Sequence, residues 1–210
     1  MEQDSDLHRR AALYYEETLR RHGATPGGVD WRDMESQEER FRQLFAVTRG
    51  ASGSIAEVGC GYGALAAWMR RSGYCNSYFG CDVSGHMVAA ARTAYGGLDG
   101  VEFEQGYWAA NADFVVASGI FNIQFDDHDT RWRAYVERTI LRMSERARYG
   151  FAFNCLTTSS DPERMESRLF YAHPPEILDW CMRRFGRHVA LRHDYGLYEF
   201  TVLVWKSLSF

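Results

Sequence analysis

The sequence lacks a surplus of basic residues and lacks any long apolar run. Its 24 Lys and Arg residues are outnumbered by 28 Asp and Glu residues, and the two signs are mixed along the chain. Nucleic acid is therefore not an expected partner, because phosphate backbones are bound by clustered positive charge. No stretch approaches the roughly eighteen apolar residues of a membrane span, and the charged start "MEQDSDLHRR" has no apolar leader segment. These absences predict a cytoplasmic protein without a membrane partner.

The chain also lacks the cysteine spacing of a disulfide framework or a metal site. Its five cysteines are odd in number, include no C-x-x-C pair and mostly lie within apolar runs. This pattern is typical of reduced, buried thiols. No cluster of His, Cys, Asp and Glu has metal-ligand spacing, so we expect no metal.

Residues 1–50 have the pattern of a helical cap that belongs to the same domain as the rest of the chain. Apolar residues at helical spacing predict a helix from Leu7 to Arg21, which "HGATPGG" then ends. The stretch "SQEE" at 36–39 has the form of a capping box. It predicts a second helix from Ser36 to Val47.

In the main domain, residues 51–210, short apolar strands alternate with helices. Strands are expected at 55–58, 77–82, 101–104, 113–118 and 149–154, and helices at 63–71, 84–95 and 130–146. Alternation of this kind predicts parallel strands joined by right-handed crossovers. The fold class is therefore α/β, with a doubly wound sheet covered on both faces.

The last fifty residues depart from that alternation. Proline and glycine signals in 161–186 predict two helices with a loop between them. Two apolar strands follow, near 187–192 and 198–206, on either side of the turn "DYGL". They must pair antiparallel because no crossover helix separates them.

The stretch "EVGCGYG" at 57–63 places three glycines between a strand and a helix. Gly59, Gly61 and Gly63 allow the backbone to approach a ligand, and helix amides follow directly. Asp82 ends the next strand, where a carboxylate accepts hydrogen bonds from ribose hydroxyls. This arrangement predicts a nucleotide-type site.

Two ligands fit these glycines. Gly59, Gly61 and Ala64 satisfy the dinucleotide motif G-x-G-x-x-[GA]. Glu57 opposes that interpretation, because its carboxylate repels a pyrophosphate and attracts an ammonium group. The third glycine at Gly63 and the terminal hairpin also favour a different cofactor.

At these residues the chain resembles the class I S-adenosylmethionine-dependent methyltransferases, from about Ser54 to Lys206. "EVGCGYG", "CDVSGHM", "FEQG" and "ADFVVASGIFN" are similar to that family's first four motifs, in order. The resemblance implies a Rossmann-like, seven-stranded sheet whose last strand is inserted antiparallel, and S-adenosylmethionine as the cofactor. It also implies roles for the motif residues. The glycine turn with Cys60 holds the methionine part of the cofactor, and Asp82 binds its ribose. Val83 and Met87 flank the adenine, and Gln105 and Gly106 lie beside the adenine ring. Ser118, Gly119 and Phe121 line the floor of the cofactor site.

The chain departs from the family pattern beside the adenine. Many relatives have an acidic residue after the glycine that follows the third strand, whereas Tyr107 follows Gly106 here. Only residues 107–112 separate that glycine from the next strand, which is too short for a covering helix. A single turn with Tyr107 and Trp108 is expected there.

The N-terminal segment also resembles the cap of a small, poorly characterised bacterial subgroup of these enzymes. "HGATPGGVDW" followed by "SQEERF" carries that resemblance. It implies that Gln37 and Arg40 lie over the methionine end of the cofactor. The alternative is a surface helix with one apolar stripe. It accounts for the apolar residue Phe41 but not for the choice of Gln37 and Arg40.

The sequence is less specific about the acceptor. Substrates of open parallel sheets sit outside the carboxyl ends of the strands, which brings Asn122 near the reacting centre. Tyr171 and His193 complete the candidate catalytic set, with His193 and His128 as possible general bases. Each residue also has an alternative without a catalytic role. Asn122 can be a loop asparagine whose side chain hydrogen-bonds to its own backbone. His193 can pack or hydrogen-bond at the hairpin turn, and His128 can belong to the solvent-exposed start of a helix.

Aromatic and amide residues favour a small-molecule acceptor, namely an amine, an amino acid or a hydroxyl-bearing metabolite. Two other functions stay open at this point. The chain either cyclises or transfers the aminocarboxypropyl arm of the same cofactor, or it is a binding module without catalysis.

Overall fold

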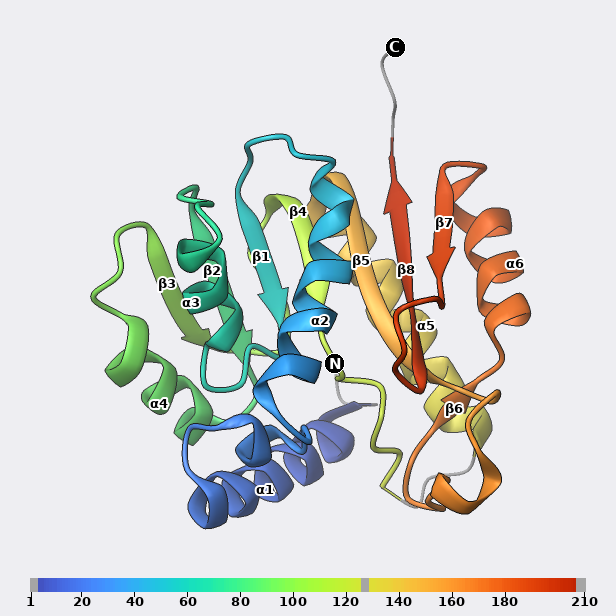
Figure 1. The fold of residues 1–210 in the computed structure, drawn as a ribbon, viewed down its shortest axis with the longest axis horizontal. Helices are drawn as coiled ribbons and strands as arrows, with labels where there is room; N and C mark the ends of the chain where they lie inside the picture. The colour runs from blue at the N-terminus through green and yellow to red at the C-terminus, as the bar shows by residue number, and fades with distance from the viewer. Residues whose placement is uncertain (1–3, 126–128, 207–210) are drawn as a thin grey trace.

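An eight-stranded sheet forms the centre of the protein in the computed structural model, which describes residues 4–125 and 129–206 (Figure 1). His128, one of the candidate bases, lies outside the described residues. Seven strands run in the order β3-β2-β1-β4-β5-β8-β7. The bounds of the strands are β1 (Ile55–Val58), β2 (Tyr78–Asp82), β3 (Val101–Gln105), β4 (Ala112–Ala117), β5 (Ala147–Thr157), β6 (Tyr171–Ala172), β7 (Val189–Arg192) and β8 (Glu199–Trp205).

The predicted α/β sheet with an inserted antiparallel strand is confirmed. Strands β1 to β5 pair in parallel, whereas β8 lies between β5 and β7 and is antiparallel to both. All seven residues of β8 are buried, because helices cover both faces of the sheet there, whereas β3 at the edge alternates buried and exposed residues. The eighth strand was not predicted: two-residue β6 pairs with the end of β5.

Helices cover the two faces of the sheet in separate layers (Figure 1). Phe41, Leu65 and Val88 belong to one apolar core, and Trp132, Ile140 and Cys181 belong to the core on the other face. The first face carries α2 (Met34–Phe45), α3 (Ala64–Arg71) and α4 (Gly85–Tyr95), and the second carries α5 (Asp129–Arg146) and α6 (Pro174–Phe185). Short turns η2 (Pro26–Val29), η3 (Ala46–Thr48) and η4 (Pro162–Arg164) complete the elements.

Helix α1 (Ser5–His22) belongs to neither layer. It crosses the end of the sheet at the carboxyl ends of the parallel strands, as Figure 1 shows at the bottom of the view. Its Leu7 reaches the core beside α5, and its His8 ring stacks on Tyr107 with 4.5 Å between ring centroids. The helix thus covers the end of the sheet at which open α/β proteins bind ligands.

Three local predictions were wrong. Helix α2 begins at Met34 rather than at a Ser36 cap, because the side chain of Asp33 accepts the Ser36 amide at 2.8 Å and takes the capping role. Residues 161–186 contain one α-helix and the short turn η4 instead of two helices, since the chain after Arg164 extends toward β6. The turn expected at Tyr107 and Trp108 is an irregular loop.

Candidate functional site

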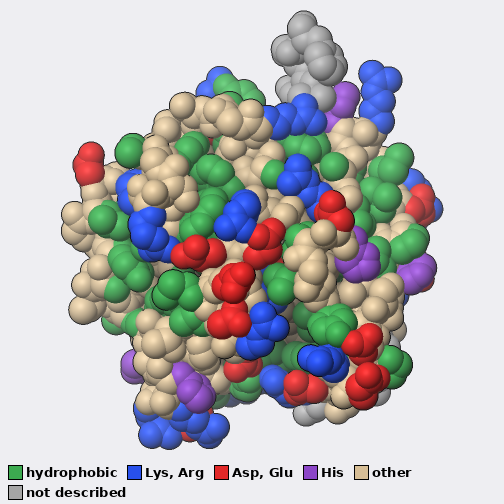
Figure 2. All heavy atoms as spheres, viewed as in Figure 1, with side chains coloured by type: hydrophobic (Ala, Val, Ile, Leu, Met, Phe, Trp, Pro, Cys, Tyr) green, Lys and Arg blue, Asp and Glu red, His purple; other side chains and the backbone are tan. Residues whose placement is uncertain are grey.

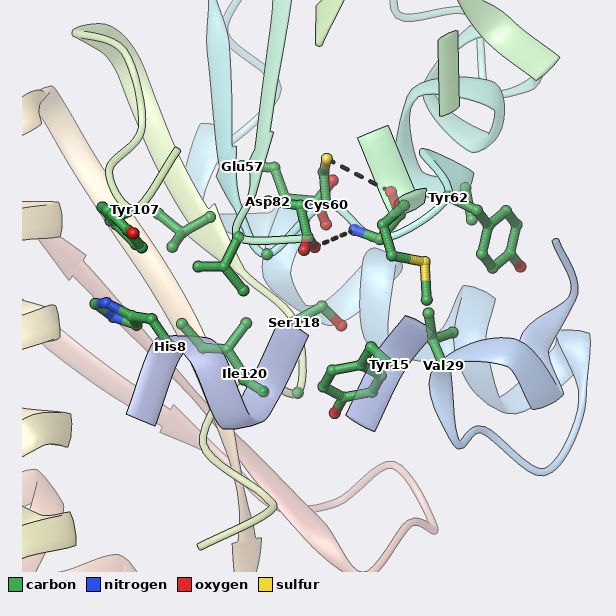
Figure 3. Close-up of a pocket in the computed structure, with 18 of the residues that line it drawn as sticks. His8, Tyr15, Val29, Glu57, Cys60, Tyr62, Asp82, Tyr107, Ser118 and Ile120 are labelled. Carbon is green, nitrogen blue, oxygen red and sulfur yellow. Dashed lines mark hydrogen bonds between the residues drawn. The ribbon is translucent and has the colours of Figure 1, made fainter. Parts of the chain in front are cut away.

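A cavity lies between the ends of β1, β2 and β4 and the covering helix α1 (Figure 3). We call it the first cavity. Most of the predicted cofactor residues line it, although they come from separate strands and from α2. They are Gln37, Glu57, Gly59, Cys60, Gly61, Asp82, Val83, Met87, Gly106, Ser118 and Gly119.

The glycine turn after β1 forms one wall of the first cavity. Gly59 has φ of 71°, and a Cβ atom there would lie 2.3 Å from Cγ2 of Ile120. No other residue fits this position without displacing Ile120, which itself lines the cavity. The turn therefore presents bare backbone to a ligand.

Asp82 lies at the middle of the first cavity, at the end of β2. Its Oδ2 accepts from the Gly61 amide and its Oδ1 from the Ser84 amide, both at 2.9 Å. Burial raises the pKa of Asp82, and these backbone hydrogen bonds oppose the rise. Each carboxylate oxygen keeps a further lone pair, so the side chain can still accept from a pair of ligand hydroxyls.

Glu57 is the second carboxylate of the first cavity and is only 2% exposed. The Tyr78 hydroxyl donates to its Oε2. Burial raises the pKa of Glu57 to about 8, and Asp82 adds to the rise while Tyr78 opposes it. A buried carboxyl group of this kind is stabilised by a ligand that brings a positive charge.

The two ends of the first cavity differ in character. Figure 3 shows His8 and Tyr107 at one end, Tyr62 and Val29 at the other, and Asp82 between them. A flat apolar group fits the aromatic end, where Val83 also lies. Since the donor set consists of Glu57, Asp82 and bare glycine backbone, the cavity fits a ligand with an ammonium group and ribose hydroxyls.

Four predicted cofactor residues do not line the first cavity. Gly63 is the N-cap residue before α3, and a Cβ atom there would lie 2.7 Å from the Phe103 ring, so a glycine is needed there for packing. Gln105 is exposed and donates to the Val83 carbonyl at 3.1 Å. The Phe121 side chain is buried in the core; Ile120 takes its expected place at the cavity.

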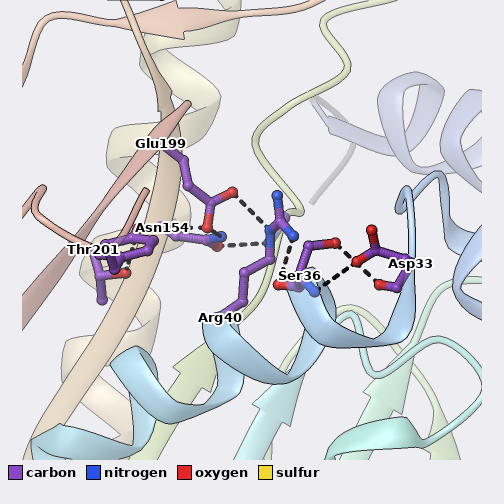
Figure 4. Close-up of polar contacts among 8 residues, drawn as sticks. Asp33, Ser36, Arg40, Asn154, Glu199 and Thr201 are labelled. Atoms are coloured by element: carbon purple, nitrogen blue, oxygen red, sulfur yellow. Dashed lines mark hydrogen bonds and ion pairs between the residues drawn. The ribbon is translucent and has the colours of Figure 1, made fainter. Parts of the chain in front are cut away.

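The fourth of these residues, Arg40, belongs to a buried polar network beneath a neighbouring cavity (Figure 4). Its Nε donates to Glu199 at 2.8 Å, and Nδ2 of Asn154 donates to the same carboxylate at 3.0 Å. The Asn154 Oδ1 accepts from the Gly119 amide at 2.7 Å. The guanidinium group also covers one face of the Trp31 ring, 3.8 Å from its centroid. The network joins α2 to β5 and β8.

A second cavity adjoins the first and contains two of the three candidate catalytic residues. Asn122 and Tyr171 line it, together with Ile123, Leu156 and Tyr198. Asn122 is buried, and its Oδ1 has no hydrogen-bond partner among the described residues. His193 is exposed at the end of β7 and lines neither cavity, so the structure does not bring it to the other candidates.

Several residues of the site were missed by the sequence analysis. Tyr15, Val29 and Trp31 from the N-terminal segment line both cavities, and His8 lines the first. Val29 and Trp31 belong to the stretch "HGATPGGVDW", in which no site residue was predicted, and no motif includes His8 or Tyr15. All four reach the site through the path of α1 and of the segment after it across the end of the sheet. The aromatic character of His8, Tyr15 and Trp31 is the other sequence signal.

Other surface and composition features add little to the site. On the face shown in Figure 2, described Lys and Arg side chains are interspersed with Asp and Glu rather than gathered in one patch. Among the described residues, no group of His, Cys, Asp and Glu forms a metal site and no helix has the length and apolarity to cross a bilayer. All five cysteines are described, and none forms a disulfide.

The chain is similar in sequence to known methyltransferases. Residues 55–139 match the family model described as a methyltransferase domain. A Mycobacterium tuberculosis (strain ATCC 25618 / H37Rv) protein named "Putative methyltransferase Rv1506c" is 46% identical over 158 residues, which are 73% of this chain and 93% of that protein.

Solved structures share the fold at low sequence identity. Magnesium protoporphyrin IX methyltransferase from Synechocystis PCC 6803, with bound SAH, has a TM-score of 0.59 and 14% identity, and the match covers 82% of this chain and 84% of that one. The DhpI–SAH complex has a TM-score of 0.54 and 18% identity, with 96% and 94% covered.

Proposed function

Because the chain belongs to the class I S-adenosylmethionine-dependent methyltransferases, we propose that it methylates a small molecule held in the second cavity. One observation carries the proposal: two cavities meet at Gly119, one lined by the carboxylates Glu57 and Asp82, the other by Asn122 and Tyr171. A cofactor site and an acceptor site must adjoin in this way for a group to pass between them.

We assign the ends of the cofactor by the charges and surfaces of the first cavity. Glu57 and the glycine turn hold the methionine end, Asp82 the ribose, and Val83 with Met87 the adenine. When bound, S-adenosylmethionine supplies a methyl group on a positively charged sulfur, and transfer to an acceptor lone pair leaves the sulfur–carbon electron pair on sulfur. Gln37 belongs to the methionine end, since the Tyr62 hydroxyl donates to its Oε1 at 2.8 Å and leaves its amide NH₂ to donate.

In this proposal the acceptor site works by alignment of the acceptor with the cofactor. Asn122 offers a buried amide, and the Tyr171 ring is held by β6 and by the Glu166 amide, which donates to its hydroxyl at 3.0 Å. Orientation of two reactants lowers the barrier without a strong acid or base. Amines, amino acids and hydroxyl-bearing metabolites are the classes we propose.

Mass spectrometry tests the reaction. The purified protein is incubated with S-adenosylmethionine and a panel of amines, amino acids and hydroxylated metabolites. S-adenosylhomocysteine formed only when an acceptor is added supports methyl transfer. Methylthioadenosine formed at catalytic rates overturns it in favour of transfer or cyclisation of the aminocarboxypropyl arm, and binding without any product identifies a non-catalytic module.

Calorimetry tests the cofactor site. Asp82→Ala is expected to weaken S-adenosylhomocysteine binding by roughly tenfold or more, because buried hydrogen bonds to a charged group are worth about 1.5 to 3 kcal/mol. The matched control is Asp99→Ala, which removes an exposed carboxylate outside the first cavity. Equal affinity of the Asp82 variant and the control would refute the assignment.

A further inference from the structure

Four residues line both cavities and so define the passage between them. They are Tyr15 from α1, Val29 and Trp31 from the segment that follows, and Gly119 after β4. We call this passage the junction. Figure 3 shows Tyr15 and Val29 on the α1 side of the first cavity and Ser118 on the strand side.

Polar groups without partners flank the junction. The Oγ of Ser118, which lines the first cavity, and the Oδ1 of Asn122, which lines the second, are buried and have no hydrogen-bond partner in the described part of the chain. The Tyr15 side chain is half-buried, and no hydrogen bond of its hydroxyl to a described residue is found. Buried polar atoms in native proteins are nearly always paired, so unpaired ones on residues that line these cavities point to ligands that pair with them.

The junction contains no free base. Among the described residues that line the second cavity there is no histidine, and its two carboxylates are engaged: Glu166 by Arg168 at 2.7 Å, Asp30 by the Tyr14 hydroxyl. Burial raises the pKa of Tyr15, with Asp30 adding to the rise, so its phenol stays protonated near neutral pH. A neutral nucleophile that releases its proton to solvent rather than to a protein base suits this site.

Two of the four junction residues, Tyr15 and Trp31, are aromatic. The Arg40 guanidinium covers one face of the Trp31 ring, and Gly119 approaches the indole so closely that a Cβ atom there would lie 2.3 Å from its Cζ2. The Arg40 side chain is in turn fixed by Glu199. The position of the indole is thereby set before any ligand arrives, which favours a flat, apolar molecule of limited size.

We infer that the acceptor is a flat, largely apolar molecule whose uncharged amine or hydroxyl group is positioned at the junction by the Tyr15 hydroxyl and the Asn122 amide. This inference rests on the proposed function, because it places the acceptor in the second cavity. Tyr15 is a positioning residue in this account, and the proton that the methylated group releases passes to solvent.

Fluorine NMR with three matched probes tests the inference. Binding of 4-fluoroaniline, 4-fluorophenol and 4-fluorotoluene is measured on protein saturated with S-adenosylhomocysteine. The aniline or the phenol is expected to bind about three- to tenfold tighter than the toluene, which lacks the N–H or O–H group. Tyr15→Phe is expected to remove most of this advantage and leave toluene binding unchanged.

Tyr149→Phe is the matched control, since it deletes an exposed hydroxyl near the start of β5, at the opposite end of the strands. It should leave the binding of all three probes unchanged. The inference is overturned if none of the probes binds, if the toluene binds as tightly as the other two, or if Tyr15→Phe keeps the advantage intact. Failure of S-adenosylhomocysteine to bind, measured separately by calorimetry, overturns the proposed function and this inference with it.

Discussion

Replacement of Glu57 by Gln should remove a pH dependence from the stability of the protein. The pKa of the buried Glu57 carboxyl is raised from 4.5 to about 8. Between these values the folded chain keeps a proton that the unfolded chain loses, so the free energy of unfolding falls as pH rises, by about 1.4 kcal/mol per pH unit. The whole pKa shift corresponds to a loss of about 5 kcal/mol in the free energy of unfolding between low pH and pH values above 8.

Urea unfolding between pH 5.5 and 8.5, without ligand, measures this effect. Glutamine has the shape of the protonated carboxyl and does not titrate, so the stability of Glu57→Gln should increase relative to wild type as pH rises and level off above pH 8. Glu104→Gln, on the exposed side of β3, should follow wild type throughout. If the free energies of unfolding of wild type and Glu57→Gln change with pH in parallel, the reasoning is refuted, because folding would then not raise the pKa of Glu57.

Two other perturbations test the network beneath the second cavity. Arg40→Met should lower the free energy of unfolding by about 3 to 5 kcal/mol, because it leaves the Glu199 carboxylate buried without its cation. A loss below about 1 kcal/mol in urea unfolding would contradict a buried ion pair between these residues. Gly119→Ala, with φ of 73° and Trp31 in contact, should cost clearly more stability than Gly73→Ala, with φ of 80° and open space around it. Equal losses in the two alanine variants would mean that the contact with Trp31 contributes nothing.

The sheet and the centre of the first cavity were predictable because their signals are local. Most strands are short apolar runs, and β3 alternates apolar and polar residues. Gly59, Gly61 and Asp82 occur at the ends of strands or in the turn that follows, where a turn requires glycine or a strand ends in a side chain that faces the ligand. Parallel pairing then brings these ends together without further information. The antiparallel hairpin at the end of the chain followed from the same reasoning.

The junction was not predictable, because it depends on contacts between distant segments. Trp31 meets Gly119 and Arg40 meets Glu199, and no spacing rule relates these positions. The site residues of the cap were placed over the cofactor from resemblance alone, and Arg40 lines the neighbouring cavity instead. The start of helix α2 was predicted two residues too late for a local reason: Asp33, and not Ser36, is the N-cap residue.

The pairing of Arg40 with Glu199 has a consequence for biosynthesis. The two residues are 159 positions apart, so strands β1 to β7 are synthesised before the carboxylate that receives Arg40, at the start of β8. Until then the guanidinium has no ion-pair partner, Trp31 has no fixed support, and the second cavity lacks the wall that Leu197 and Tyr198 supply. The buried ion pair and this wall of the second cavity therefore depend on residues that are synthesised after strands β1 to β7.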